Sequence, residues 1–271
     1  MSLKEHDPMA SPPKTAPSGS PVFPLGLPDG SRNALADWAI FLDIDGTLLD
    51  IAETPGTVRV PEGLIQNLAT LSHKLDGALA LVTGRSIAFV DEIFRGARFP
   101  VAGLHGAERR DPTGRTSHIE LTPDFLRAKG ALKKRARDWP EILVEDKHAA
   151  IAVHYRQAPQ FEPDMQKLMR EIAEIAGPQW TLQQGKLVTE LRPAAHDKGY
   201  ALAAYMAGPP FSARRPLAFG DDVTDESMFK AANAANGLSV KIGSPAEKVS
   251  SAKLYMESPA TLRSWLSEIA Q

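Results

Sequence analysis

The stretch from Phe41 to Leu49 constrains the fold and the chemistry of this chain more than any other. The apolar run that ends at Leu42 is typical of a buried strand, and Gly46 follows where the chain must turn. Between them, Asp43 and Asp45 would lie about 6–7 Å apart along an extended backbone. Ligands bind at the C-terminal ends of strands in open α/β sheets, so both carboxylates fall at such a position. They would repel each other unless a hard cation such as Mg²⁺ lies between them or one of them carries a proton.

Composition places this motif in an ordinary globular chain. The 271 residues are 43% hydrophobic and 24% charged, enough for one α/β domain and a smaller insert. The net charge of -2 gives no general attraction to nucleic acid or to an anionic membrane, so we expect neither as a partner. The chain has no cysteine, which excludes disulfides and thiolate metal sites.

The first residues differ from the rest of the chain. Residues 1–33 are rich in Pro, Ser and Gly and carry no periodic apolar pattern, so they predict a flexible tail. No signal peptide is recognisable in this stretch, and no later segment has the roughly 18–20 apolar residues of a transmembrane helix. We therefore expect a cytoplasmic protein.

Beyond the tail, apolar runs alternate with segments of helical periodicity. This alternation predicts an α/β core with a parallel sheet, formed by residues 34–110 and 192–271. The predicted core strands are Trp38–Leu42, Ala78–Val82, Phe99–Leu104, Pro216–Gly220 and Leu238–Ile242.

The pattern changes between residues 111 and 191. Helical periodicity over Phe125–Trp139 and Phe161–Ala176 alternates with an extended segment, Ala149–Tyr155, and with two short strands around Gly185. This arrangement predicts a small α+β cap domain, residues 111–191, inserted into the core.

Three further strand ends carry residues suited to anion or metal binding. A strand, then Thr83, Gly84 and Arg85, then a helix start would form a cradle for a phosphate oxygen. Lys198 precedes a helix and could reach a phosphoryl oxygen as a point charge. A fourth strand ends in the acidic run 221–226, which could supply oxygen ligands to a metal.

In this order, the four strand ends resemble the motifs of the haloacid dehalogenase-like (HAD) phosphatases. The resemblance implies a Rossmann-like core with a type IIB α+β cap, Asp43 as nucleophile and Asp45 as general acid and base. It also implies that Thr83 and Lys198 contact the phosphoryl group. Mg²⁺ would be held by Asp43, the Ile44 carbonyl and Asp221, and the predicted metal set is Asp43, Asp45, Asp221 and Asp222, with Asp222 acting through water and Asp225 behind it.

Three other segments, Leu104–Arg110, His154–Pro159 and Gln183–Lys186, resemble bacterial trehalose-6-phosphate phosphatases. That resemblance implies trehalose 6-phosphate as substrate, with its sugar hydroxyls held by the cap. The substrate-binding residues predicted on this basis are Gly84, Arg85, His105, Arg109, Glu145, Lys147, Arg156 and Glu190.

Other readings of the same residues remain open. One is a phosphatase of the same fold for sucrose 6-phosphate or a hexose phosphate. A second is a sugar-phosphate-binding regulator without turnover, and a third is a phosphoryl mutase. The sequence also leaves open whether a trehalose-6-phosphate synthase associates with the chain.

Overall fold

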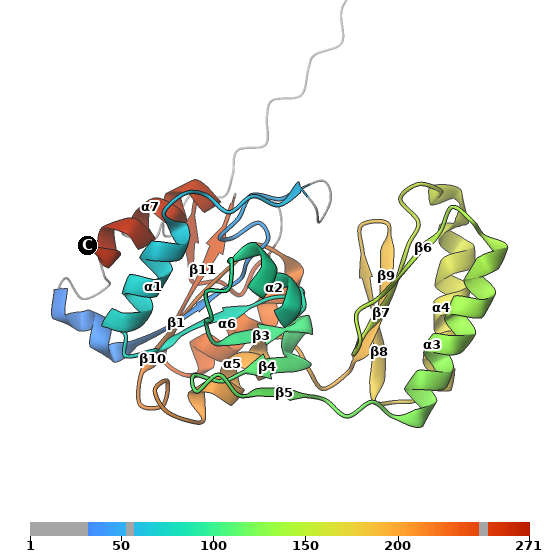
Figure 1. The fold of residues 1–271 in the computed structure, drawn as a ribbon, viewed down its shortest axis with the longest axis horizontal. Coiled ribbons are helices and arrows are strands. Elements are labelled where there is room, and N and C mark those ends of the chain that lie inside the picture. Colours follow the sequence, from blue (N-terminus) through green and yellow to red (C-terminus); the bar gives the residue numbers. More distant parts are fainter. Residues whose placement is uncertain (1–31, 53–56, 244–248) are drawn as a thin grey trace, which may run out of the picture.

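Two sheets of unequal size organise the chain in the computed structural model (Figure 1). The structure describes residues 32–52, 57–243 and 249–271. The tail expected at residues 1–33 therefore lies almost wholly outside the described residues. The strands are β1 Trp38–Leu42, β2 Leu79–Val82, β3 Val101–Gly103, β4 Glu108–Arg110, β5 Thr116–His118, β6 Leu143–Asp146, β7 Ile151–His154, β8 Trp180–Gly185, β9 Val188–Pro193, β10 Arg215–Gly220, β11 Leu238–Ile242 and β12 Leu254–Met256.

The larger sheet has eight strands in the order β12-β11-β10-β1-β2-β3-β4-β5. Its strands from β12 to β3 pair in parallel, whereas β4 pairs antiparallel with β3 and β5 pairs antiparallel with β4. In this register Leu42 pairs with Leu81 on one side and with Phe219 on the other. The C-terminal ends of β1, β2 and β10 therefore meet at one edge, where the sequence predicts the site.

Helices flank the larger sheet in two packed pairs, α1 with α7 and α5 with α6. Local sequence explains where they begin: the Asp197 side chain accepts the backbone N–H of Tyr200 at the start of α5, and Ser258 accepts that of Thr261 at the start of α7. The helices are α1 Leu64–Lys74, α2 Ile87–Ile93, α3 Pro123–Arg135, α4 Glu162–Ala176, α5 Lys198–Met206, α6 Glu226–Ala234 and α7 Pro259–Ala270, with short 3₁₀ turns at Arg32–Asp37, Leu104–Gly106, Ala136–Asp138, Pro159–Phe161 and Val223–Asp225.

The smaller sheet, of order β6-β7-β9-β8, is antiparallel throughout. Helices α3 and α4 pack together on the side of this sheet that faces away from the core (Figure 1). Their apolar side chains and the sheet form a second hydrophobic core, separate from that of the larger sheet. This smaller lobe is hereafter called the cap.

The boundary between the lobes differs from the expected residue 111. Residues 111–115 form the turn between β4 and β5, and β5 pairs with β4 in the larger sheet. The chain crosses to the cap after His118 and returns after Pro193, so the first core segment extends eight residues further than predicted, to residue 118. Across the described ranges, no helix is both long and apolar enough to cross a membrane.

Candidate active site

Asp43 lies at the end of β1 and is buried with a lysine. Lys198, the first residue of α5, donates hydrogen bonds to Asp43 Oδ1 at 2.6 Å and to Asp225 Oδ1 at 2.7 Å. Burial raises the pKa of Asp43 well above its usual value, although the charge of Lys198 opposes this effect. Burial would lower the pKa of Lys198, but the two carboxylates raise it overall, so the ammonium remains charged. The site thus holds a carboxylate beside a fixed positive charge.

A second carboxylate, Asp221, approaches Asp43 from the end of β10. The hydroxyl of Thr47 lies 3.2 Å from Asp43 Oδ2 and 3.2 Å from Asp221 Oδ1. Burial and the nearby charge of Asp225 raise the pKa of Asp221 to about 6. Two partly desolvated carboxylates with raised pKa values form a donor set that suits a hard divalent cation.

The approach of Asp221 to Asp43 requires a glycine at position 46. Gly46 has φ +81°, and a Cβ at this position would lie 2.2 Å from Asp221 Oδ2. A larger residue would therefore displace the carboxylate or the turn. Gly46, which the sequence predicts at a turn, therefore also leaves room for the Asp221 carboxylate.

The structure brings together two of the four predicted metal ligands, Asp43 and Asp221. Asp225 joins them in one acidic cluster, but its oxygens already accept bonds from Lys198 and from the backbone N–H groups of Asp221 and Asp222. Asp222 is exposed, and its carboxylate accepts the backbone N–H of Val223. Asp225 therefore holds the acidic loop in place.

The Ile44 carbonyl does not fit the predicted metal site. It accepts the backbone N–H groups of Leu48 and Leu49 at 3.0 and 2.8 Å, with Thr47 N–H at 3.4 Å. The turn after β1 uses this oxygen, so the ligand predicted from the family resemblance is corrected here.

Asp45, the predicted general acid, is bound to a cation. Arg85 donates from Nε to one carboxylate oxygen and from Nη2 to the other, both at 2.9 Å. Burial lowers the pKa of Arg85, but its hydrogen bonds to Asp45 and the nearby carboxylate charges together raise it overall. The residue predicted to act as a general acid and as a metal ligand therefore faces a guanidinium in this structure. This pairing also places the Asp45 carboxylate outside the acidic cluster.

At the end of β2, the backbone N–H groups expected to form a phosphate cradle bond within the protein: that of Arg85 donates to Thr83, and that of Ile87 donates to Glu108 at 2.9 Å. Thr83 is fully buried, and its hydroxyl accepts the backbone N–H of Arg85 at 3.1 Å. Gly84 packs against His105, where an added Cβ would lie 2.8 Å from the imidazole ring. Burial lowers the pKa of His105 well below its usual value, so the ring is neutral.

The cap supplies the facing wall of the site. Lys147 Nζ lies 3.2 Å from Glu190 and 3.8 Å from Glu145, and the His154 ring lies 2.9 Å from Glu145. Glu145, His154 and Glu190 lie in the neighbouring strands β6, β7 and β9, and Lys147 and Arg156 closely follow β6 and β7. Sequence reasoning did not assign His154 to the site, although its position at the end of the strand before Arg156 marks it.

Core and cap residues line one cavity of about 510 Å³. It contains Asp45, Gly84, Arg85 and His105 from the core, and Glu145, Lys147, His154 and Arg156 from the cap. Among the described residues, no hydrogen bond or ion pair joins the cap turn at 145–148 to Asp43 or Asp45. The polar groups of the cap therefore bond to one another and not to these two core acids.

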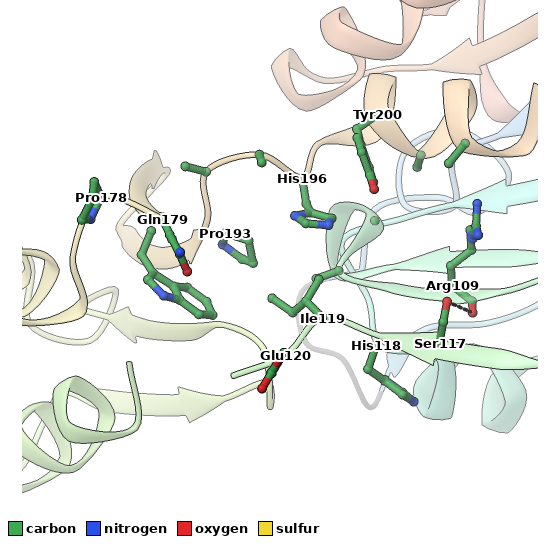
Figure 2. A pocket seen from close by; sticks show the side chains of 17 residues that line it. Arg109, Ser117, His118, Ile119, Glu120, Pro178, Gln179, Pro193, His196 and Tyr200 are labelled. Carbon is green, nitrogen blue, oxygen red and sulfur yellow. Dashed lines mark hydrogen bonds between the residues drawn. The ribbon is translucent and has the colours of Figure 1, made fainter. Parts of the chain in front are cut away.

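Arg109 lies outside the cavity that core and cap share. With His196 it lines a separate cavity of about 650 Å³ between the two crossings of the chain from core to cap, shown in Figure 2. The guanidinium of Arg109 lies over the Tyr205 ring at 5.7 Å. The two cavities share no lining residue, so Arg109 does not join the other predicted substrate-binding residues.

Comparisons with known proteins agree with this geometry. The family described as Trehalose-phosphatase matches residues 41–260. The chain is 54% identical over 211 residues to a probable trehalose-phosphate phosphatase of Sinorhizobium fredii, covering 78% of this chain and 80% of the relative. It is 45% identical over 217 residues to the trehalose-6-phosphate phosphatase of Escherichia coli, covering 79% and 81%. A crystal structure of a trehalose-6-phosphate phosphatase related protein superposes with a TM-score of 0.71 at 27% identity, covering 85% of this chain and 96% of that one.

Proposed function

This chain belongs to the trehalose-phosphatase family, and from that premise we propose that it hydrolyses trehalose 6-phosphate to trehalose and inorganic phosphate. The observation that carries the proposal is the cavity shared by the two lobes. Its core wall holds Asp45 with Gly84, Arg85 and His105, and its cap wall holds Glu145, Asp146, Lys147, His154 and Arg156. The first wall suits a phosphate ester, and the second suits the hydroxyls of a sugar.

In the proposed first step, Asp43 attacks phosphorus. A bond forms between its carboxylate oxygen and phosphorus, and the bond from phosphorus to the sugar oxygen breaks. The leaving oxygen takes a proton from Asp45. Lys198, 2.6 Å from Asp43, offsets the repulsion between the carboxylate and the phosphate dianion.

Asp45 must exchange its ion pair for a proton before it can act as an acid. We propose that the cap brings about this exchange. Glu145 lines the same cavity, and its charge already raises the pKa of Arg85. As the cap approaches, Glu145 is placed to draw the guanidinium from Asp45, which couples sugar binding to the proton transfer.

In the second step, water attacks the phosphorus of the aspartyl-phosphate. Asp45 accepts the proton of this water, and the bond between phosphorus and Asp43 breaks. Inorganic phosphate leaves and the free carboxylate of Asp43 is restored, so the residue that donated a proton in the first step recovers one in the second.

Two acids, Asp43 and Asp221, would hold the Mg²⁺ that the family is expected to use. When bound, this ion would neutralise charge on the phosphoryl oxygens and relieve the repulsion between the two carboxylates. The fit rests on their shared Thr47 hydroxyl and on their raised pKa values.

The test is phosphate release from trehalose 6-phosphate, measured beside sucrose 6-phosphate and glucose 6-phosphate. We expect trehalose 6-phosphate to be strongly preferred, and activity to be lost with EDTA and in Asp43→Asn. Preference for another sugar phosphate would contradict the substrate assignment while keeping the chemistry. Tight binding without phosphate release would instead indicate a regulator, and transfer of the phosphoryl group to a second sugar would indicate a mutase.

A further inference from the structure

One of the proposed sugar-binding side chains, Lys147, lies in the tight turn between β6 and β7, whereas Glu145 is held within β6 by its pairing with Ala152 of β7. Both residues line the cavity of about 510 Å³ that core and cap share, hereafter called the catalytic cavity. The residue after Lys147, His148, has φ 66°, a left-handed conformation that is unfavourable for a residue with a side chain. The position of Lys147 therefore depends on what holds residues 146–148 from behind.

A buried lysine of α3 contacts the turn at two points. Lys129 Nζ lies 2.5 Å from Asp146 Oδ1 and donates to the carbonyl oxygen of His148 at 3.0 Å. The same Asp146 oxygen accepts the backbone N–H of His148 at 3.0 Å. Lys129 thus joins the carboxylate and the carbonyl that flank Lys147. Its side chain is only 11% exposed, and its ammonium lies 5.5 Å from the centre of the Phe125 ring.

A second lysine provides an internal comparison. Lys133, one helical turn further along α3, pairs with the other oxygen of Asp146 at 2.6 Å, but its side chain is 52% exposed. Among the described residues, Lys133 forms no hydrogen bond with the backbone of the turn. An exposed ion pair contributes little because water screens it, whereas a buried ammonium bonded to a carbonyl restricts the backbone.

We propose that Lys129 is a positioning residue for substrate recognition, which fixes the turn that carries Lys147. This inference rests on the proposed function, because it assigns the Lys147 side chain to the sugar. Lys129 does not line the catalytic cavity, so it acts through the turn and contacts neither the substrate nor the phosphoryl group. Burial would raise the pKa of Asp146, but the hydrogen bonds from Lys129 and Lys133 lower it overall, which agrees with a charged anchor.

The test compares Lys129→Met with Lys133→Met on two esters. One is trehalose 6-phosphate, and the other is 4-nitrophenyl phosphate, which reaches Asp43 but has no sugar hydroxyls. Since a small misplacement of binding groups costs much in rate or affinity, Lys129→Met should raise KM for the sugar phosphate about tenfold or more. Its kcat/KM on the aryl phosphate should change by less than about twofold, because the phosphoryl site is untouched. Lys133→Met should stay within about twofold on both esters.

Two more variants complete the test. Lys129→Arg keeps the charge and should retain most of the preference for the sugar ester. Lys129→Gln, which keeps one donor for the carbonyl, replaces Lys129→Met if that variant does not fold. Equal losses on both esters, no rise in KM for the sugar, or an effect of Lys133→Met as large as that of Lys129→Met would overturn the proposal. If the wild-type protein prefers another sugar phosphate, the substrate assignment fails, and the same comparison is made on the preferred ester.

Discussion

Replacing Asp225 with asparagine should damage both the stability of the core and its chemistry. Asp225 is fully buried, and its two oxygens accept from Lys198 and from the backbone N–H groups of Asp221 and Asp222. An amide has one acceptor oxygen and one NH₂ group. In either orientation of the amide, its NH₂ group faces a donor. Lys198 also keeps only Asp43 as a counter-charge.

The structure sets the size of the effect. Breaking a buried ion pair by removing one partner costs about 3–5 kcal/mol, and the remaining acceptor oxygen of asparagine should reduce this to about 2–3 kcal/mol. For a chain of this size that loss lowers Tm by about 4–9 °C. Because the loop carrying Asp221 also loses an anchor, kcat/KM should fall about a hundredfold.

Thermal unfolding and phosphate release from trehalose 6-phosphate measure both effects. Asp222→Asn is the matched control for the unfolding measurement, since its exposed side chain only caps a short turn and its loss should cost about 1 kcal/mol or less. If Asp225→Asn unfolds and reacts like the wild-type protein, the pairing of Lys198 with Asp225 does not organise the site.

Three other expectations follow from the same contacts. Since protons compete with Mg²⁺ for Asp221, whose pKa is raised to about 6, the Mg²⁺ concentration for half-maximal activity should rise as pH falls below 6 and level off above it. Gly46→Ala should weaken Mg²⁺ binding about tenfold or more in calorimetry, because the added Cβ meets Asp221, whereas Gly63→Ala has a similar φ, +77°, with nothing within 4 Å and should leave it unchanged. Glu190→Gln should raise KM for trehalose 6-phosphate while leaving hydrolysis of 4-nitrophenyl phosphate nearly unchanged.

Each of these has a contrary result. A half-maximal Mg²⁺ concentration that is constant from about pH 5 to 8 would show that Asp221 does not control metal binding. Equal weakening in Gly46→Ala and Gly63→Ala would attribute the effect to backbone strain. Equal losses of Glu190→Gln on both esters would place Glu190 outside sugar recognition.

The sequence predicts the parts of the core site that depend on strand ends. Asp43, Thr83, Lys198 and Asp221 each follow a buried strand or begin a helix, and parallel pairing brings such ends to one edge. Local pattern and sheet topology are therefore sufficient to place them.

The lobe boundary could not be placed by the same reasoning. Strand β5 is exposed along its whole length and shows no alternation of apolar residues. Strand β4 buries two charged residues: Glu108 accepts the backbone N–H of Ile87, and Arg110 donates to the carbonyl of Phe99. A pattern based on hydrophobicity treats these strands as a break, because the bonds that satisfy their charges come from distant segments.

The pairing of Asp45 with Arg85 was also outside the reach of the sequence. The two residues are 40 positions apart, and their contact depends on side-chain orientation at neighbouring strand ends. The same limit applies to Arg109. Its sequence segment resembles that of the trehalose-6-phosphate phosphatases, but its side chain lines the cavity of about 650 Å³ between the two crossings of the chain from core to cap. The hydrophobic pattern predicts where a strand lies, but which of the two cavities a side chain lines depends on packing.

The most direct test of the central claim is whether Asp43 carries the phosphoryl group of trehalose 6-phosphate. The protein would be mixed with substrate labelled in its phosphate, quenched in acid during turnover and digested, and the labelled peptide identified. We predict label on the peptide that contains Asp43, removed by hydroxylamine as expected for an acyl phosphate, and none in Asp43→Asn. Normal turnover with no label on Asp43, or with label on another residue, would contradict the mechanism.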